Sequence, residues 1–99
     1  MRRKARVDNN QSLIVEALRR AGCSVALTHQ IGKGFPDAVA GWVGLSGRRF
    51  TVLLEIKSTP AAKLTPDEQA FHETWQGAIE IVRDPEQAVA AMQRYRREH

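Results

Sequence analysis

The middle of this chain reads Arg48-Arg49-Phe50-Thr51-Val52-Leu53-Leu54-Glu55-Ile56-Lys57. The even-numbered residues from 50 to 56 are all apolar, whereas Glu55 and Lys57 stand at odd positions. Successive side chains of a β-strand point to opposite faces of a sheet. The alternation therefore predicts a strand over 48–57 with one wholly apolar face, and Glu55 and Lys57 leave from the opposite face.

A second strand is predicted over residues 37–43, because a Gly-Leu-Ser-Gly connection suited to a hairpin separates it from the first. If that connection leaves an odd number of residues unpaired, Gly44 pairs with Arg48 and Asp37 lies directly opposite Glu55. Opposed residues have Cβ atoms roughly 5 Å apart, so two carboxylates and an ammonium would then converge. An even loop without a bulge would send Asp37 to the other face instead.

The remaining elements follow from hydrophobic spacing and from capping residues. Apolar residues at helical spacing predict a first helix over about 10–21, and a short β-type run follows at 24–28. Thr65 and Asp84 each begin a capping motif, which predicts helices over 65–76 and from 85 onward, with a strand over 78–82 between them. The order α-β-β-β-α-β-α indicates an α/β fold, and the absence of a linker predicts a single domain over residues 1–99.

Positive charge gathers at the two ends of the chain. The formal charge is +4, from 15 Lys and Arg against 11 Asp and Glu. Residues 1–6 hold four positive charges and residues 94–99 hold three arginines and one glutamate, which leaves −2 for residues 7–93. The basic ends, 1–8 and 94–99, are interpreted either as flexible arms that seek phosphate or as solvated tails that aid solubility.

Composition argues against several classes of protein. No window approaches the roughly 18 apolar residues of a membrane helix, so no membrane association is expected. The one cysteine, Cys23, has no partner for an internal disulfide, and no Cys/His cluster suits zinc. We therefore expect a soluble protein of the cytoplasm.

Asp37, Glu55 and Lys57, if they converge, form an arrangement suited to phosphodiester hydrolysis. Two close carboxylates repel unless a cation lies between them, and hard oxygen ligands without His or Cys suit Mg²⁺ or Mn²⁺. Such a cation polarises a phosphoryl oxygen and activates a water, while Lys57 orients or helps deprotonate that water and stabilises developing charge. The alternative is a surface Glu55–Lys57 pair on a solvent-facing strand, where charged alternation is common.

Pro36-Asp37, followed after a hairpin by Glu55-Ile56-Lys57, resembles the PD-(D/E)xK nuclease signature, and the element order is similar to the core of that superfamily. The flanking residues resemble small stand-alone VRR-NUC domains, such as those of phages, which are similar to Holliday-junction resolvases. The stretches that carry this resemblance are Lys33-Gly34-Phe35-Pro36-Asp37, Leu53-Leu54-Glu55-Ile56-Lys57-Ser58, Leu64-Thr65-Pro66-Asp67-Glu68-Gln69 and Ile81-Val82-Arg83. The resemblance covers most of residues 10–90.

The resemblance implies a restriction-endonuclease-like core, in which a mixed central sheet is flanked by helices. It also implies that Asp37 and Glu55 are metal ligands, that the Ile56 carbonyl is a further ligand, and that Lys57 is the catalytic lysine. The implied activity is a structure-selective rather than sequence-selective cleavage of DNA.

Further residues match the family less specifically. Glu16 matches an acidic residue of the first helix that binds metal directly or through water, but it is also placed to pair with Arg20 on the helix surface. Gln69 matches a helix glutamine near the active site but is equally a solvent-exposed helix residue. Ser58 is a further candidate for active-site support, and so is His29, although a lone histidine in a loop is more often an ordinary surface residue. The basic residues that could contact DNA, or be solvated charges, are Arg2, Arg3, Lys4, Arg6, Lys33, Arg48, Arg49 and Lys63.

We therefore expect a metal-dependent DNA endonuclease that uses Mg²⁺ or Mn²⁺ and acts on branched or otherwise structured DNA. Cutting two strands requires two sites, so a homodimer is expected. If the chain is phage-encoded, it would work in the host cytoplasm. A non-catalytic DNA-binding or scaffolding module of the same fold is the alternative. A protein adaptor that never meets nucleic acid is a third hypothesis, and affinity for DNA that falls with salt would exclude it.

Overall fold

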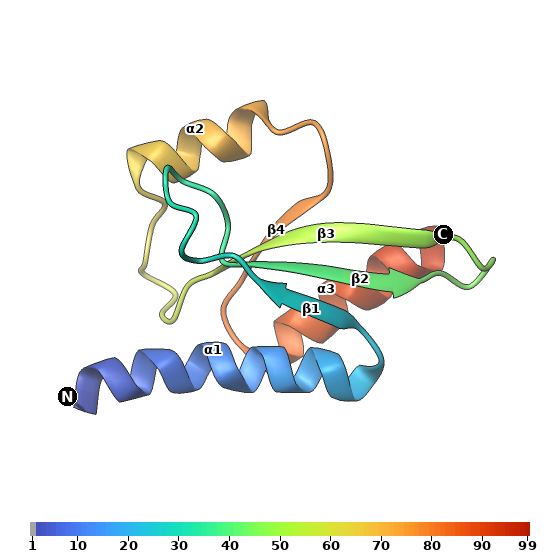
Figure 1. The fold of residues 1–99 in the computed structure, drawn as a ribbon, viewed down its shortest axis with the longest axis horizontal. Helices are drawn as coiled ribbons and strands as arrows, with labels where there is room; N and C mark the ends of the chain where they lie inside the picture. The colour runs from blue at the N-terminus through green and yellow to red at the C-terminus, as the bar shows by residue number, and fades with distance from the viewer. Residues whose placement is uncertain (1) are drawn as a thin grey trace.

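The computed structural model describes residues 2–99, with side chains from Asn10 onward, and consists of three helices and one four-stranded sheet (Figure 1). The elements follow in the order α1 (Arg2–Ala21), β1 (Ser24–Leu27), β2 (Ala38–Val43), β3 (Arg49–Ile56), α2 (Pro66–Thr74), β4 (Ile79–Val82) and α3 (Pro85–Glu98). This succession confirms the predicted α-β-β-β-α-β-α order and the α/β class. None of the helices over 2–99 combines the length and the apolar character needed to cross a bilayer.

The sheet is mixed, as expected. Its strands lie in the order β1-β2-β3-β4, with β1, β2 and β3 antiparallel and β4 parallel to β3. A hydrogen bond of 2.7 Å from the Gly44 N–H to the Arg48 carbonyl closes the turn between β2 and β3, so three residues stay unpaired there. This odd loop fixes the register that brings Asp37 opposite Glu55, one step beyond the last residue pair of the ladder.

The hydrophobic core lies between one face of the sheet and the helices α1 and α3, which pack on that face (Figure 1). Alternate residues of the strands point into it because successive strand side chains face opposite ways. Its buried members are Ile14 and Leu18 from α1, Cys23, Ala38, Ala40, Phe50, Val52, Leu54 and Val82 from the sheet and its entry, and Ala88, Ala91 and Met92 from α3. The side chains of Glu55 and Lys57 extend from the opposite face of the sheet.

The first helix is longer than the sequence pattern predicted. It begins at Arg2 rather than near residue 10, because residues 2–9 contain no glycine or proline and the arginines and lysine among them favour a helix. It ends where expected, at Ala21, and is followed by Gly22, whose φ of 116° is left-handed. The Gly22 N–H donates to the Arg19 carbonyl at 3.1 Å and the Cys23 N–H donates to the Leu18 carbonyl at 2.9 Å, which is the Schellman pattern.

Both predicted capping motifs are present. Thr65 accepts the Glu68 N–H and Glu68 caps the Thr65 N–H in return, while Asp84 accepts the Gln87 N–H at 2.8 Å at the start of α3. Helix α2 ends at Thr74, two residues earlier than predicted. It lies apart from the sheet, next to the loop that follows β1 (Figure 1), and no residue of α2 is buried.

The basic segment 94–99 is not a free arm, contrary to the first interpretation of the chain ends. It belongs to α3, which runs to Glu98 and packs on the hairpin turn. Tyr95 donates to Glu80 at 2.6 Å, the Arg96 guanidinium lies 4.5 Å from the centre of the Trp42 ring, and the His99 ring stacks on Phe50. The segment is therefore held by contacts of Tyr95, Arg96 and His99 with residues of the sheet.

Candidate active site

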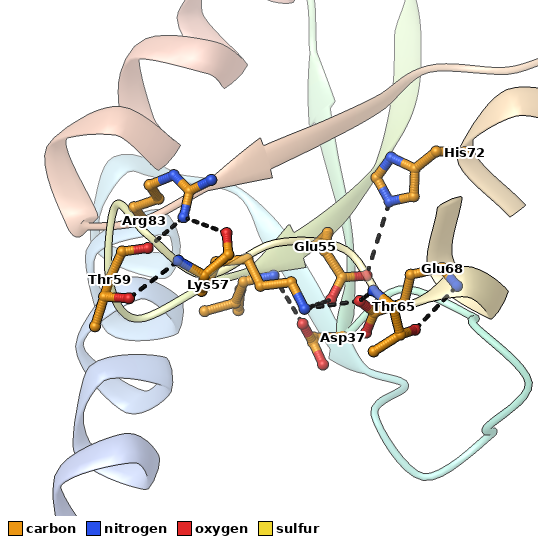
Figure 2. A network of polar contacts seen from close by, with 10 residues as sticks. Asp37, Glu55, Lys57, Thr59, Thr65, Glu68, His72 and Arg83 are labelled. Atoms are coloured by element: carbon orange, nitrogen blue, oxygen red, sulfur yellow. Dashed lines mark hydrogen bonds and ion pairs between the residues drawn. The ribbon is translucent and has the colours of Figure 1, made fainter. Parts of the chain in front are cut away.

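Asp37 is fixed at the point where β2 begins. Its N–H donates to the Leu54 carbonyl at 3.0 Å, and its own carbonyl accepts the Thr28 N–H at 2.8 Å. The Asp37 carboxylate accepts the Ile56 N–H through Oδ2 at 2.7 Å (Figure 2). The strands on both sides therefore hold this carboxylate between the ends of β2 and β3.

Glu55 is almost completely buried, with 2% of its surface exposed. Its Oε2 atom lies 3.6 Å from Lys57 Nζ, and its Oε1 atom lies 3.8 Å from His72 Nε2 without a hydrogen-bond partner. A solvent-facing Glu55–Lys57 pair, which was the alternative interpretation, is therefore wrong for Glu55. Burying a carboxylate without full compensation is costly, which marks this group as a candidate functional residue.

The surroundings of Glu55 raise its pKa to about 8. Burial is the main cause, because it disfavours the charged form. The charge of Asp37, a hydrogen bond with the Asp37 side chain and the charge of Glu68 raise the pKa further, and the Lys57 ammonium opposes them only in part. Two acids in contact thus compete for ionisation, a condition that a bound cation would relieve.

Lys57 points toward these acids from the end of β3. Its backbone N–H donates to the Val82 carbonyl at 3.0 Å, and its side-chain ammonium lies 2.7 Å from Glu68 Oε1 (Figure 2). Burial alone would lower the pKa of Lys57, but the hydrogen bond to Glu68 and the charges of Glu68, Glu55 and Asp37 raise it overall. Lys57 is therefore a cation at neutral pH.

Helix α2 supplies two residues that the sequence pattern did not assign to the site, Glu68 and His72. They stand four residues apart, so both face the same side of the helix. Burial would raise the pKa of Glu68, but the Lys57 ammonium and the Thr65 N–H lower it overall, whereas burial lowers the pKa of His72. Two features of the sequence could have indicated these residues: their four-residue spacing, and the position of Glu68 as the glutamate of the predicted capping box.

Gln69, the predicted helix residue, lies beside this site. Its amide donates to Glu73 at 3.0 Å on the helix surface. It also lines a groove of about 510 Å³, hereafter the loop groove, between the 58–64 segment and β4. The side chains that line the groove are Lys57, Pro60, Ala61, Ala62, Lys63, Leu64, Gln69, Ile81 and Arg83. No acidic residue is among them, so the groove is cationic.

Other predicted support residues lie outside the cluster of contacts. Glu16 is exposed and pairs with Arg20 at 3.3 Å, which is the helix-surface alternative considered for it. His29 and Ser58 are exposed, and no side-chain hydrogen bond or ion pair within the described part of the chain joins either of them to the site. The predicted ligand set therefore reduces to Asp37, Glu55 and the Ile56 carbonyl in this structure.

The predicted DNA-contacting residues are dispersed. Lys63 lines the loop groove, Lys33 is exposed, and Arg48 donates to the Glu98 carbonyl at 3.2 Å. Arg49 lines a separate groove of about 450 Å³ near the hairpin turn. The side chains of Arg2, Arg3, Lys4 and Arg6 lie outside the described part of the structure.

The residues that converge fit a hard divalent cation. Among the described side chains, no three His, Cys, Asp or Glu residues are grouped so that they could hold a metal ion by themselves. Two carboxylates and a backbone carbonyl are nevertheless a set that suits Mg²⁺, which keeps several waters. The Ile56 N–H is directed to Asp37, and the carbonyl of a strand residue leaves on the same side as its N–H, so the Ile56 carbonyl faces this region too.

Comparison of the chain with protein-family models, with curated proteins and with solved structures found no match in any of the three.

Proposed function

We propose that this chain is a metal-dependent DNA endonuclease with a PD-(D/E)xK active site on a restriction-endonuclease-like core. The observation that carries the proposal is the convergence of Asp37, the buried Glu55 and Lys57 at the ends of β2 and β3. A buried carboxylate with an unpartnered oxygen and a raised pKa, next to a second carboxylate, is costly without a cation. The mixed sheet, with α1 and α3 packed on one face, agrees with such a core.

Asp37, Glu55 and the Ile56 carbonyl would hold Mg²⁺ or Mn²⁺. When bound, the cation supplies polarisation of a phosphoryl oxygen and a lower pKa for a coordinated water. The two carboxylates also accept hydrogen bonds and can orient an attacking water. A bound cation would favour the ionised form of Glu55 and add positive charge at the site, so DNA binding close to these residues should strengthen with the cation.

Lys57 acts in this proposal as a cation and not as a general base. Its hydrogen bond with Glu68 and its raised pKa keep the ammonium protonated at neutral pH. A protonated lysine cannot take a proton from water, but it can donate a hydrogen bond and stabilise negative charge that develops on the phosphate oxygens. This assignment narrows the two roles that the sequence left open for Lys57.

The loop groove would receive the DNA strand next to the reacting phosphate. Lys57 forms part of both the carboxylate cluster and the groove, and Lys63 and Arg83 add positive charge without an acidic neighbour in the lining. Such a groove attracts a phosphate backbone irrespective of base sequence, which agrees with structure-selective action. One chain carries one site, so cutting both strands of branched DNA would require a homodimer.

Cleavage of labelled DNA tests the proposal. Duplex, single-stranded, flap and four-way-junction substrates would be incubated with the protein in Mg²⁺, in Mn²⁺ and in EDTA. We expect cleavage that needs the divalent cation and favours branched substrates. The absence of cleavage of every substrate, together with salt-sensitive binding to DNA, would instead favour a non-catalytic DNA-binding module.

A further inference from the structure

Glu68 belongs to two local structures at once. Its Oε1 atom accepts the Thr65 N–H at 2.9 Å and lies 2.7 Å from Lys57 Nζ, while its own N–H donates to Thr65 Oγ1 at 3.2 Å (Figure 2). The first and third contacts form the capping box of α2. The second contact reaches across to the end of β3 and joins the helix to the candidate active site.

Among the described residues, no other hydrogen bond or ion pair of the Lys57 ammonium is as short as its contact with Glu68. The ammonium lies 3.6 Å from Glu55 Oε2, which is beyond ordinary hydrogen-bond distance. The lysine side chain has four rotatable carbon links, so an unanchored ammonium samples many positions. The capping box holds the Glu68 carboxylate on a helix start, which gives Lys57 a fixed partner.

The Lys57–Glu68 contact lies outside the hydrophobic core. No residue of α2 is buried, and the helix packs instead through Phe71, whose ring lies 5.2 Å from the Phe35 ring. The side chains of Lys57 and Glu68 are 14% and 19% exposed, so their ion pair is shielded but not part of the core. Loss of the Glu68 charge should therefore leave the fold intact.

We propose that Glu68 is a positioning residue that holds the Lys57 ammonium beside the Asp37 and Glu55 carboxylates. This inference rests on the proposed nuclease function for its catalytic consequence, although the placement of Lys57 can be tested without it. Glu68 acts through Lys57 and need not touch the DNA. The capping box of α2 thus serves the site as well as the helix.

Two single substitutions separate these roles of Glu68. Glu68→Gln keeps a side chain that can complete a capping box but removes the negative charge that pairs with Lys57. Thr65→Ala removes the hydroxyl that accepts the Glu68 N–H, yet leaves both the Glu68 carboxylate and the Thr65 backbone N–H that it accepts. The first variant should affect Lys57 with little loss of stability, and the second should lower the thermal midpoint with little effect on Lys57.

The first measurement is the nitrogen–proton NMR signal of the Lys57 ammonium in the protein without metal or DNA. A hydrogen-bonded, shielded ammonium exchanges its protons slowly enough to be observed, and Lys57→Arg identifies the signal by removing it. We expect the signal in the wild type and in Thr65→Ala, and its loss in Glu68→Gln. A signal that persists unchanged in Glu68→Gln would overturn the proposed placement.

The second measurement is the single-turnover rate of DNA cleavage in saturating Mn²⁺, with the dissociation constant for DNA measured in parallel. Glu68→Gln should slow cleavage by about 10- to 100-fold and change the dissociation constant less than about twofold, because a misplaced Lys57 ammonium lowers the cleavage rate more than it weakens DNA binding. The same substitution in a Lys57→Ala background should have less than about a twofold effect. An equal loss in both backgrounds would refute action through Lys57.

The two measurements also distinguish failure of this inference from failure of the proposed function. A wild-type protein that cuts no DNA would refute the nuclease proposal, and the NMR comparison would still decide whether Glu68 holds Lys57. A wild-type protein that cuts DNA at the same rate as Glu68→Gln would refute the positioning role and leave the nuclease proposal standing.

Discussion

Glu55→Gln tests whether burial among acids governs the ionisation of Glu55. The carboxyl has a pKa of about 8 in the folded protein, compared with an ordinary value of 4.5. Between these two values the folded protein holds a proton that the unfolded chain releases. The folded state therefore loses stability as the pH rises toward 8, which is the reverse of the usual behaviour of a paired carboxylate.

The magnitude is best measured between pH 7 and pH 8.5. In that interval Glu68 and Lys57 keep their charges in both states, and the small change in His72, which titrates from its ordinary pKa of 6.5 in the unfolded chain, is common to the wild type and the variant. Linkage for a pKa of about 8 predicts that the metal-free wild type loses about 1 kcal/mol of unfolding free energy over this interval. Glu55→Gln carries no titrating group at this position, so its unfolding free energy should lack this loss.

Urea unfolding in EDTA at a series of pH values measures this difference. Glu86→Gln is a matched control, because Glu86 is an exposed residue in the first turn of α3 and should keep the wild-type pH dependence. Adding Mn²⁺ at pH 8.5 to about 100 times its dissociation constant should raise the unfolding free energy of the wild type by about 3 kcal/mol, but should not raise that of Glu55→Gln. Parallel pH curves for the wild type and Glu55→Gln would show that the pKa of Glu55 is not raised in the folded protein.

Four further substitutions test the remaining assignments. Asp37→Asn should abolish cleavage while DNA affinity in EDTA, measured by fluorescence anisotropy, stays equal or rises, because the variant removes a negative charge; weaker binding would argue against the assigned role. Lys63→Ala should make the slope of log affinity against log salt less steep by about 1, which corresponds to the loss of one phosphate contact. An unchanged slope would indicate that DNA does not bind in the loop groove. Gly44→Ala should destabilise the protein by more than about 2 kcal/mol in urea unfolding, since its Cβ would lie 2.2 Å from the His99 carbonyl carbon. Gly47→Ala, in open space at a φ of 95°, should cost only about 1 kcal/mol, and equal losses would contradict the packing of α3 on the hairpin turn.

Much of the fold could be predicted from local signals in the sequence. The alternation in 48–57, the glycines of the hairpin connection and the two capping motifs each act over a few residues, and all of them are present in the structure. The start of α1 could not be predicted, because the polar residues near Asn10 resemble a helix entry although good helix formers precede them. The docking of α3 on the hairpin depends on contacts such as Arg96 with Trp42, which are distant in sequence.

The candidate site was predictable where it lies within one hairpin. The odd-loop register was enough to bring Asp37 to Glu55, and the two-residue spacing placed Lys57 on the face of Glu55. The contributions of Glu68 and His72 depend on where α2 lies relative to the end of β3, which no local pattern specifies. The orientation of that helix also explains why Gln69 lies beside the site, in the loop groove, rather than in it.

The most direct test of the central claim is the single-turnover cleavage rate of a branched DNA substrate by the wild type and by Lys57→Ala, measured in Mn²⁺ and in EDTA. We expect cleavage by the wild type only with the cation, and a rate at least about 100-fold lower for Lys57→Ala with DNA affinity reduced only slightly. Cleavage that persists in EDTA, or that proceeds at the wild-type rate without Lys57, would contradict the assignment of this site.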